Sequence, residues 1–452
     1  MSSSGRKIGR RQFVQGAGAG VAMFHVVPRF VLGGPGKEAP SDKLNIAGIG
    51  AGGRGASDIR GVSSENIVAL CDVDDKRAAG MYKKHPKAKT FRDFRKMFDA
   101  MDKDIDAVTV GTPDHTHAVI CMNALKRGKH VYCEKPLAHS VGEIRALQKA
   151  AKEAKVVTQV GNQGHSSERI RQLCEWVWDG AIGEVKEVHA RCGAFPQVYC
   201  QIDKLPKLAE KNDVPETLDW DLWLGPAKQR PYSPLYVPWN WRGWLPFGTG
   251  AIGDWICHVV DPSFWALDLG SPVSIQCEAD DYDLTKHADV YPPGTKYTYQ
   301  FAAKGKRGPV TLYWYDGKRQ IPHPACLEEK RKVPGTGAIL IGTKGGISHG
   351  SHGAGGARII PEEKMRDYKQ PEPSIPRVKG HHQDWLEAIR NGKQAGSPFD
   401  YGGALTELAL LGVIALKFPG RELKWDGEKA QFTNCPEANA YVDPPYRTGW
   451  SL

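Results

Sequence analysis

Residues 43–55 read Lys-Leu-Asn-Ile-Ala-Gly-Ile-Gly-Ala-Gly-Gly-Arg-Gly. The apolar first half of this stretch predicts a strand, and its second half is a G-x-G-x-x-G pattern that can open a helix. Gly50 permits the tight turn, Gly52 lets the backbone approach a pyrophosphate, and Gly55 lets helix and strand pack closely. The helix N-terminus would then face the phosphates. The stretch therefore predicts a dinucleotide-binding βαβ unit.

An acidic residue follows at the expected distance. A second apolar run, residues 67–71, ends at Asp72, which lies 22 positions after Gly50. A carboxylate there accepts hydrogen bonds from a ribose diol and repels a 2′-phosphate, so NAD is favoured over NADP. Two alternatives stay open: Asp72 as a helix-capping carboxylate only, and the register Gly48, Gly50 and Gly53 for the glycine pattern.

The alternation of strands and helices continues along the chain. Strands are expected at 105–110, 130–133 and 156–161, with helices at 115–127 and 141–154. This spacing predicts an α/β fold with a doubly wound parallel sheet, that is, a Rossmann domain. Ligands bind beyond the carboxyl ends of such strands, where the polar segments 111–117 and 134–136 are expected.

Five motifs in this order resemble those of the glucose-fructose oxidoreductase/inositol dehydrogenase (Gfo/Idh/MocA) family. They are the glycine turn before Asp72, Thr112-Pro113-Asp114-His115-Thr116-His117, Glu134-Lys135-Pro136, Gln159-Val160-Gly161-Asn162-Gln163 and Gly253-Asp254-Trp255-Ile256-Cys257-His258. The resemblance covers residues 43–426 and implies a Rossmann domain followed by an α/β domain with an open, mostly antiparallel sheet. We expect a leader at 1–40, a nucleotide-binding domain at 41–163, and a substrate and oligomerisation domain at 164–452.

The resemblance also implies which residues hold the cofactor. These are Gly50, Gly52, Gly53, Arg54, Gly55, Asp72, Thr112, Pro113, His115, His117, Glu134, Lys135 and Gln163.

A second set of residues suits the chemistry. Asp254, His258 and Asp261 fall at i, i+4 and i+7, on one face of a helix, where a carboxylate can orient an imidazole. In the family, the residues matching Lys135, Asp254 and His258 flank the reacting carbinol. His258 would remove the hydroxyl proton and Lys135 would hold the developing alkoxide while hydride passes to the nicotinamide. Alternatively, His258 is a core histidine and Lys135 an ordinary loop residue.

The substrate region is rich in tryptophan. Seven of the 13 tryptophans fall between residues 220 and 265, interleaved with polar side chains. Flat aromatic faces beside hydrogen-bonding groups suit a sugar ring, and we name Trp241 and Arg242 as candidates, with His165 as a third. Asp254 and His258 would also contact the substrate. Most of the tryptophans have a simpler explanation as packing of a lid or interface.

The first 40 residues resemble a twin-arginine export signal. Residues 9–15 read Gly-Arg-Arg-Gln-Phe-Val-Gln, and the apolar stretch 16–27 after them is too short for a permanent membrane span. The twin-arginine translocation machinery carries folded proteins, so a periplasmic or secreted location is expected. The alternative is an ordinary basic N-terminus.

Export constrains the reaction, because no pool of NAD is expected outside the cytoplasm. A tightly bound cofactor that is regenerated in each cycle resolves this difficulty. Two reactions fit: an oxidoreductase acting on a sugar, glycoside or polyol, which we favour, and an NAD-dependent glycoside hydrolase working through a transient 3-keto sugar. The hydrolase needs a further acid–base group, for which His165, Tyr199 or His117 are candidates. A non-catalytic sugar-binding protein is the alternative of another class.

Composition and charge bear on the partners, disulfides and metal sites to expect. The net charge is +10, but the first 40 residues hold half of it and no long basic run follows, so a nucleic-acid partner is not expected. There is no C-x-x-C pair, although Cys192 and Cys200 could form a disulfide in an oxidising compartment. No metal is expected, because two histidine pairs lack acidic or cysteine partners at ligand spacing: His349 with His352, and His381 with His382. The exposed face of the second sheet favours a homo-oligomer.

Overall fold

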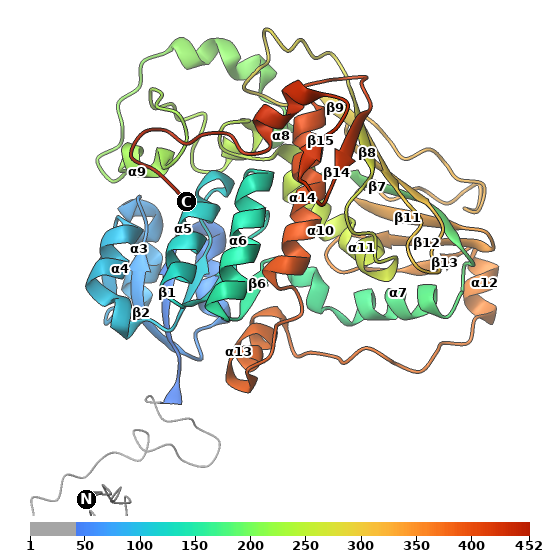
Figure 1. The fold of residues 1–452 in the computed structure, drawn as a ribbon, viewed down its shortest axis with the longest axis horizontal. Helices are drawn as coiled ribbons and strands as arrows, with labels where there is room; N and C mark the ends of the chain where they lie inside the picture. The colour runs from blue at the N-terminus through green and yellow to red at the C-terminus, as the bar shows by residue number, and fades with distance from the viewer. Residues whose placement is uncertain (1–41) are drawn as a thin grey trace, which may run out of the picture. The chain divides into compact units, whose positions relative to one another are not determined.

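The computed structural model describes residues 42–452, and the predicted leader lies outside them (Figure 1). The first sheet has six parallel strands in the order β3-β2-β1-β4-β5-β6. Its strands are β1 (Asn45–Ile49), β2 (Asn66–Cys71), β3 (Lys89–Phe91), β4 (Ala107–Val110), β5 (His130–Cys133) and β6 (Thr158–Val160). The order reverses between β1 and β4, which confirms the predicted doubly wound Rossmann sheet.

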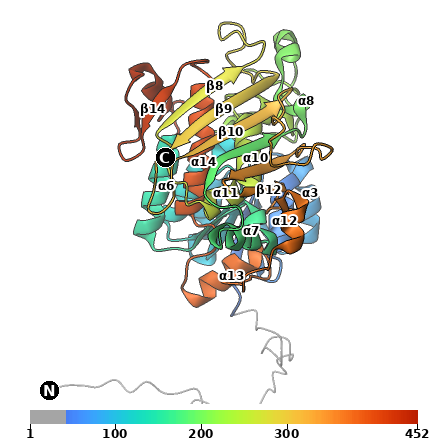
Figure 2. The ribbon, with the colours of Figure 1, turned by 90° about the vertical axis from the view of Figure 1, so that its right-hand side faces the viewer.

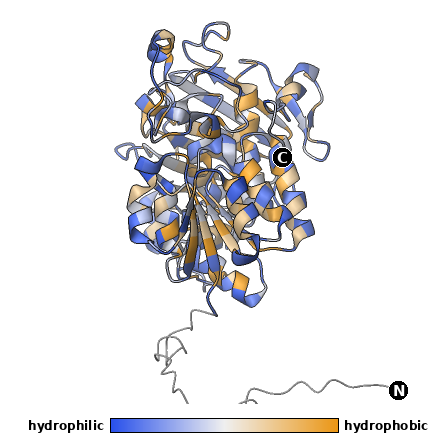
Figure 3. Ribbon diagram, turned by 90° about the vertical axis from the view of Figure 1, so that its left-hand side faces the viewer, coloured by the Kyte–Doolittle hydropathy of each residue, from blue (hydrophilic) through white to orange (hydrophobic). Residues whose placement is uncertain are grey.

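Helices cover both faces of this sheet, as its apolar strands require (Figure 3). The helices are α2 (Gly53–Gly61), α3 (Asp75–Lys84), α4 (Phe94–Met101), α5 (Asp114–Lys126) and α6 (Val141–Ala154). Local sequence fixes where α6 begins, because Ser140 and Glu143 form a capping box. The predicted helix at 141–154 is confirmed.

The second sheet has nine strands in the order β13-β12-β11-β7-β10-β9-β8-β14-β15. Its strands are β7 (Val185–Cys192), β8 (Ser274–Ala279), β9 (Gly294–Phe301), β10 (Val310–Gly317), β11 (Gly337–Gly342), β12 (Gly345–Gly350), β13 (Arg358–Ile360), β14 (Leu423–Asp426) and β15 (Gln431–Phe432). The pair β7–β10 is parallel and the other pairs are antiparallel. The predicted open, mostly antiparallel sheet is confirmed, and one of its faces is visible in Figure 2, with helices behind it.

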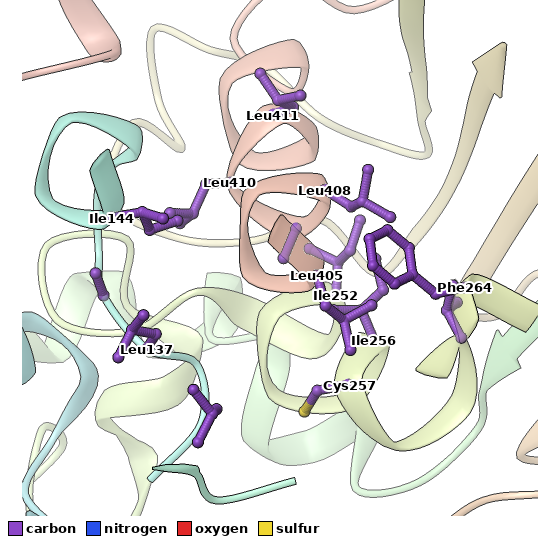
Figure 4. Close-up of a cluster of buried hydrophobic side chains, with 14 of the residues drawn as sticks. Leu137, Ile144, Ile252, Ile256, Cys257, Phe264, Leu405, Leu408, Leu410 and Leu411 are labelled. Atoms are coloured by element: carbon purple, nitrogen blue, oxygen red, sulfur yellow. The ribbon is translucent and has the colours of Figure 1, made fainter. Parts of the chain in front are cut away.

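The helices that follow α6 in the chain have different partners. They are α7 (Glu168–Trp178), α8 (Pro196–Tyr199), α9 (Trp220–Leu224), α10 (Gly250–Val259), α11 (Asp261–Ala266), α12 (Glu362–Asp367), α13 (His381–Asn391) and α14 (Phe399–Ala415). Helix α13 packs against the first sheet. The long apolar helix α14 packs against both α6 and α10. Figure 4 shows Leu410 directed toward Ile144 of α6, and Leu405 beside Ile252 of α10. This shared core joins the nucleotide-binding half of the fold to the helix that carries Asp254 and His258.

Two further features bear on the sequence predictions. None of the helices within residues 42–452 is long and apolar enough to cross a bilayer. All ten cysteines are free, so Cys192 and Cys200 do not form a disulfide in this structure.

Candidate active site

A cavity of about 700 Å³ opens at the carboxyl ends of the first sheet's strands and reaches α10. Fourteen of the predicted site residues line it: Gly50, Gly52, Gly53, Arg54, Asp72, Thr112, Pro113, Glu134, Lys135, Gln163, Trp241, Arg242, Asp254 and His258. Motifs more than 200 residues apart in sequence therefore meet around one space.

The glycine turn is shaped for close approach of a ligand. Gly50 has a φ of +81°, which favours glycine, and a Cβ added at Gly55 would lie 1.8 Å from the Gly50 carbonyl oxygen. Gly52 precedes α2 without any side-chain cap, so the first amides of the helix have no capping side chain. Asp72 accepts hydrogen bonds from the amides of Ala51 (2.8 Å) and Gly52 (3.0 Å). These features fit a dinucleotide whose phosphates meet the helix N-terminus and whose ribose meets Asp72.

Arg54 links the glycine turn to the Glu134-Lys135 loop. Its Nε lies 3.0 Å from Glu134 Oε1, and its Nη2 lies 2.9 Å from Asp58 Oδ1. Gln163 Nε2 donates to the same Glu134 oxygen at 2.6 Å. Burial raises the pKa of both Asp58 and Glu134 to about 7, although Arg54 opposes the shift. The cluster fixes the loop that carries Lys135.

Lys135 and Asp254 form a buried ion pair. Lys135 Nζ bonds the Asp254 carboxylate and also donates to the Asp254 backbone oxygen at 3.0 Å. The other carboxylate oxygen accepts from the Tyr199 hydroxyl and lies 3.3 Å from Arg242 Nε. Burial alone would raise the pKa of Asp254, but Lys135 and Arg242 hold it well below its ordinary value. The Asp254 oxygens thus face Lys135, Tyr199 and Arg242 and do not hydrogen-bond the His258 imidazole, contrary to our prediction.

His258 is a buried, neutral imidazole at the cavity. Its Nδ1 has no hydrogen-bond partner among residues 42–452, and its ring stacks on His352 with centroids 4.1 Å apart. Burial first, then Lys135 and His352, lower the pKa of His258 well below its ordinary value. A neutral imidazole at neutral pH can accept a proton. The sequence analysis named His352 only in a histidine pair with His349, because the glycine-rich loop that carries it reaches the site only through the fold.

Arg242 packs against two tryptophans at the cavity wall. Its guanidinium carbon is 4.1 Å from the Trp239 ring centroid and 4.2 Å from that of Trp241. Cation–π contacts with these two rings hold the guanidinium group in place.

Two family models match the chain. The description "Oxidoreductase family, NAD-binding Rossmann fold" matches residues 44–162, and "Oxidoreductase family, C-terminal alpha/beta domain" matches residues 198–306. Together the matches cover half of the chain, one in each part of the fold. The chain belongs to the Gfo/Idh/MocA oxidoreductase family.

Curated relatives in the Gfo/Idh/MocA family include sugar and polyol dehydrogenases. Levoglucosan dehydrogenase of Pseudarthrobacter phenanthrenivorans is 29% identical over 182 residues, which is 40% of this chain and 37% of that protein. Inositol 2-dehydrogenase of Salmonella typhimurium is 31% identical over 156 residues, 33% of this chain and 45% of that protein. The matched region thus spans less than half the length of these relatives.

Solved structures show that the Gfo/Idh/MocA fold extends through most of the chain. The WlbA dehydrogenase of Bordetella pertussis, in complex with NADH and UDP-GlcNAcA, has a TM-score of 0.60 at 15% identity and covers 85% of this chain and 99% of its own. Aldose-aldose oxidoreductase of Caulobacter crescentus, complexed with glycerol, has a TM-score of 0.54 at 18% identity, with 84% and 99% coverage.

Two histidines predicted from the Gfo/Idh/MocA motifs to bind the cofactor lie behind the cavity wall. The ring nitrogens of His115 face the carbonyl oxygens of Phe247 (3.2 Å) and Trp223 (3.0 Å). Those of His117 face Pro136 O (2.7 Å) and Thr112 O (2.8 Å). Neither histidine lines the cavity, so we assign both a supporting role. Gly55 likewise lies beneath the turn rather than at the cavity surface.

His165 and Asp261 form a separate buried pair. Asp261 begins α11, because Pro262 has no amide with which to continue α10, and it therefore leaves the face shared by Asp254 and His258. His165 Nδ1 lies 3.0 Å from Asp261 Oδ1, and its ring stacks on Trp265 at 4.3 Å. This corrects the predictions that His165 contacts substrate and that Asp261 extends the catalytic face. None of the three acid–base candidates for a hydrolase, His117, His165 and Tyr199, lines the cavity, and the Tyr199 hydroxyl is engaged by Asp254.

Two segments that contribute to the cavity wall were not predicted from the sequence: the segment before α9 and the segment that carries Trp450. The amide of Asp219 donates to Val73 O at 2.8 Å, which holds the segment before α9 against the end of β2. Trp450 lines the cavity with the Arg95 guanidinium 4.6 Å from its ring centroid. Arg447 Nη1 bonds Asp221 at 2.7 Å and ties this last segment to α9. These contacts carry no short-range sequence signal.

Among residues 42–452, no group of three or more His, Cys, Asp or Glu side chains could hold a metal ion.

Proposed function

We propose that the chain is an NAD-dependent oxidoreductase acting on a hydroxyl of a sugar, glycoside or polyol. One observation carries the proposal: a single cavity joins the glycine turn and Asp72 to Lys135, Asp254 and His258. When bound, NAD supplies the hydride acceptor. The names of the relatives that are levoglucosan and inositol dehydrogenases support the substrate class.

His258, Lys135 and Asp254 have different roles at the reacting carbinol of the substrate. His258 lines the cavity and is neutral at neutral pH because burial lowers its pKa, so its imidazole is free to accept the hydroxyl proton. Lys135 places a positive charge where the alkoxide develops, and Asp254 orients the Lys135 ammonium through their ion pair. Asp72 favours NAD over NADP, because its carboxylate at the cavity wall repels a 2′-phosphate.

Nucleotide analysis tests this proposal. Protein purified without added nucleotide is denatured and assayed for NAD(H), and intact protein is then given sugars, polyols and nitrophenyl glycosides. We expect bound NAD that a sugar or polyol reduces. Release of nitrophenol would instead support the glycoside hydrolase, and protein unable to bind NAD would contradict both enzymes. Lys135→Met should abolish reduction, whereas Lys149→Met, at an exposed position of α6, should not. Normal turnover by Lys135→Met would refute the assigned role.

We further propose export by the twin-arginine pathway with the cofactor already bound. The support is the motif at residues 9–15 and the contribution of Leu218 and Trp450, from segments far from the glycine turn in sequence, to the wall of the cavity. Cell fractionation tests the location. A purely cytoplasmic pool would contradict export, and replacement of Arg10 and Arg11 by Lys should retain the protein inside the cell.

A further inference from the structure

We propose that the substrate carries a carboxylate, as a sugar acid or uronate does, and that Arg242 binds it. This inference rests on the proposed function and names the substrate class of the same site. It would assign Arg242 a specificity role that is separate from hydride transfer.

The hydrogen-bonding capacity of Arg242 is largely unused. A guanidinium has five N–H donors, and that of Arg242 makes one hydrogen bond within residues 42–452, from Nη1 to Trp239 O at 3.3 Å. Its Nε is buried and unbonded, although it lies 3.3 Å from Asp254 Oδ2. The side chain lines the cavity with 13% of its surface exposed. Because Nε is buried and two tryptophan rings pack against the guanidinium group, a ligand in the cavity would meet its Nη groups. A planar, pre-positioned N–H fork matches a carboxylate.

The charges at this end of the cavity do not balance. Lys135 and Arg242 share a single fully ionised carboxylate, Asp254. His258 and His352 are neutral, because burial lowers the pKa of each. Asp114 also lines the cavity and accepts a hydrogen bond from the Thr249 hydroxyl. Burial followed by the charge of Asp254 raises its pKa to about 7, opposed by Arg242 and Lys135, so it carries less than a full negative charge at neutral pH.

Glu134 does not supply the missing charge to Arg242. Its carboxylate is engaged by Arg54 and Gln163 on the glycine-turn side. Buried cations without a counter-charge are costly, so an anionic ligand is favoured here. The excess is no more than one positive charge, which matches a monovalent carboxylate better than a divalent phosphate ester.

Aromatic side chains beside Arg242 provide a place for the sugar ring. Phe195 and Trp239 line the same cavity and leave 48% and 47% of their surfaces exposed, which is unusual for such large apolar side chains. Their rings meet edge to face at 6.4 Å. A sugar ring can lie against such faces while its carboxylate bonds Arg242.

The test compares an acid with its neutral and phosphorylated counterparts. NAD-loaded protein is titrated with D-glucuronate, D-glucose and D-glucose 6-phosphate, following tryptophan fluorescence for binding and nicotinamide fluorescence for turnover. We expect D-glucuronate to bind at least about tenfold more tightly than D-glucose, as for one charge-assisted contact. Equal binding of the two, or preference for the phosphate ester, would overturn the proposal. Oxidation of neutral sugars alone would overturn it while leaving the proposed function intact.

Variants of Arg242 isolate its contribution. Arg242→Gln should weaken D-glucuronate binding by about ten- to a hundredfold, and Arg242→Lys should restore part of the loss because it keeps the charge. Arg230→Gln is a matched control, because Arg230 also lies over aromatic rings but does not line the cavity. A thermal melt identifies any variant that fails to fold. If Arg242→Gln weakens NAD binding as much as D-glucuronate binding, Arg242 serves the cofactor and the proposal fails.

Discussion

Replacing Gly55 by alanine should disable the nucleotide site through a single methyl group. The added Cβ would lie 1.8 Å from the Gly50 carbonyl oxygen and 3.3 Å from that of Gly111. An ordinary carbon–oxygen contact is on the order of 3.3 Å, so the turn or the helix must move by more than 1 Å. Overpacking of this kind costs about 1–3 kcal/mol of stability. A displacement of that size in a positioned binding loop costs about a hundredfold in function.

The matched control for this variant is Gly80→Ala. Gly80 lies in α3, and a Cβ added there meets nothing within 4 Å. Alanine should therefore stabilise this helix by about 0.5–1 kcal/mol and leave NAD binding unchanged. Calorimetric titration with NAD and a thermal melt of both variants make the comparison. If Gly55→Ala binds NAD as the parent does, the glycine turn does not hold the dinucleotide as we describe.

Three further predictions follow from the same contacts. Lys135→Met leaves Asp254 buried with one cation fewer, so urea unfolding should show a loss of about 3–5 kcal/mol, and an unchanged midpoint would refute the ion pair's role. Trp450→Ala should speed the release of bound NAD in a chase experiment, since its ring lines the cavity; an unchanged release rate would show that Trp450 does not retain the cofactor. Burial lowers the pKa of His115 from 6.5 to about 3. The His115 side chain is therefore protonated below pH 6.5 in the unfolded chain but only below about pH 3 in the folded protein. The stability advantage of the parent over His115→Gln should therefore shrink by about 2 kcal/mol between pH 7 and pH 5 in urea titrations, and a constant difference would show that His115 is not held neutral.

Local patterns predicted the first half of the fold well. The glycine turn and the apolar runs predicted β1, β2, β4, β5 and β6, because a parallel sheet buried on both faces needs such runs. The short strand β3 escaped prediction, since its three residues are half-exposed to exposed and read as loop. The break at Pro262 between α10 and α11 also escaped, although proline without an amide was its visible signal.

The site was predictable only where its motifs are local. Lys135, Asp254 and His258 belong to motifs that could be quoted from the sequence, and the structure brings them to one cavity. His352 and Trp450 reach that cavity from distant loops, and tertiary packing alone brings them there. The hydrogen-bond partners of Asp254 could not be read from i, i+4 spacing, because two cations from other segments compete for its oxygens.

The measurement that tests the central claim most directly is a single turnover of NAD-loaded protein with its best sugar or polyol, comparing the parent with His258→Asn. We predict stoichiometric reduction of the bound nicotinamide by the parent. We also predict a loss of at least about a hundredfold in rate for His258→Asn, with NAD affinity unchanged. Reduction at the parental rate in the variant, or a parent that binds NAD but is reduced by no sugar or polyol, would contradict the assignment of this cavity as an oxidoreductase site.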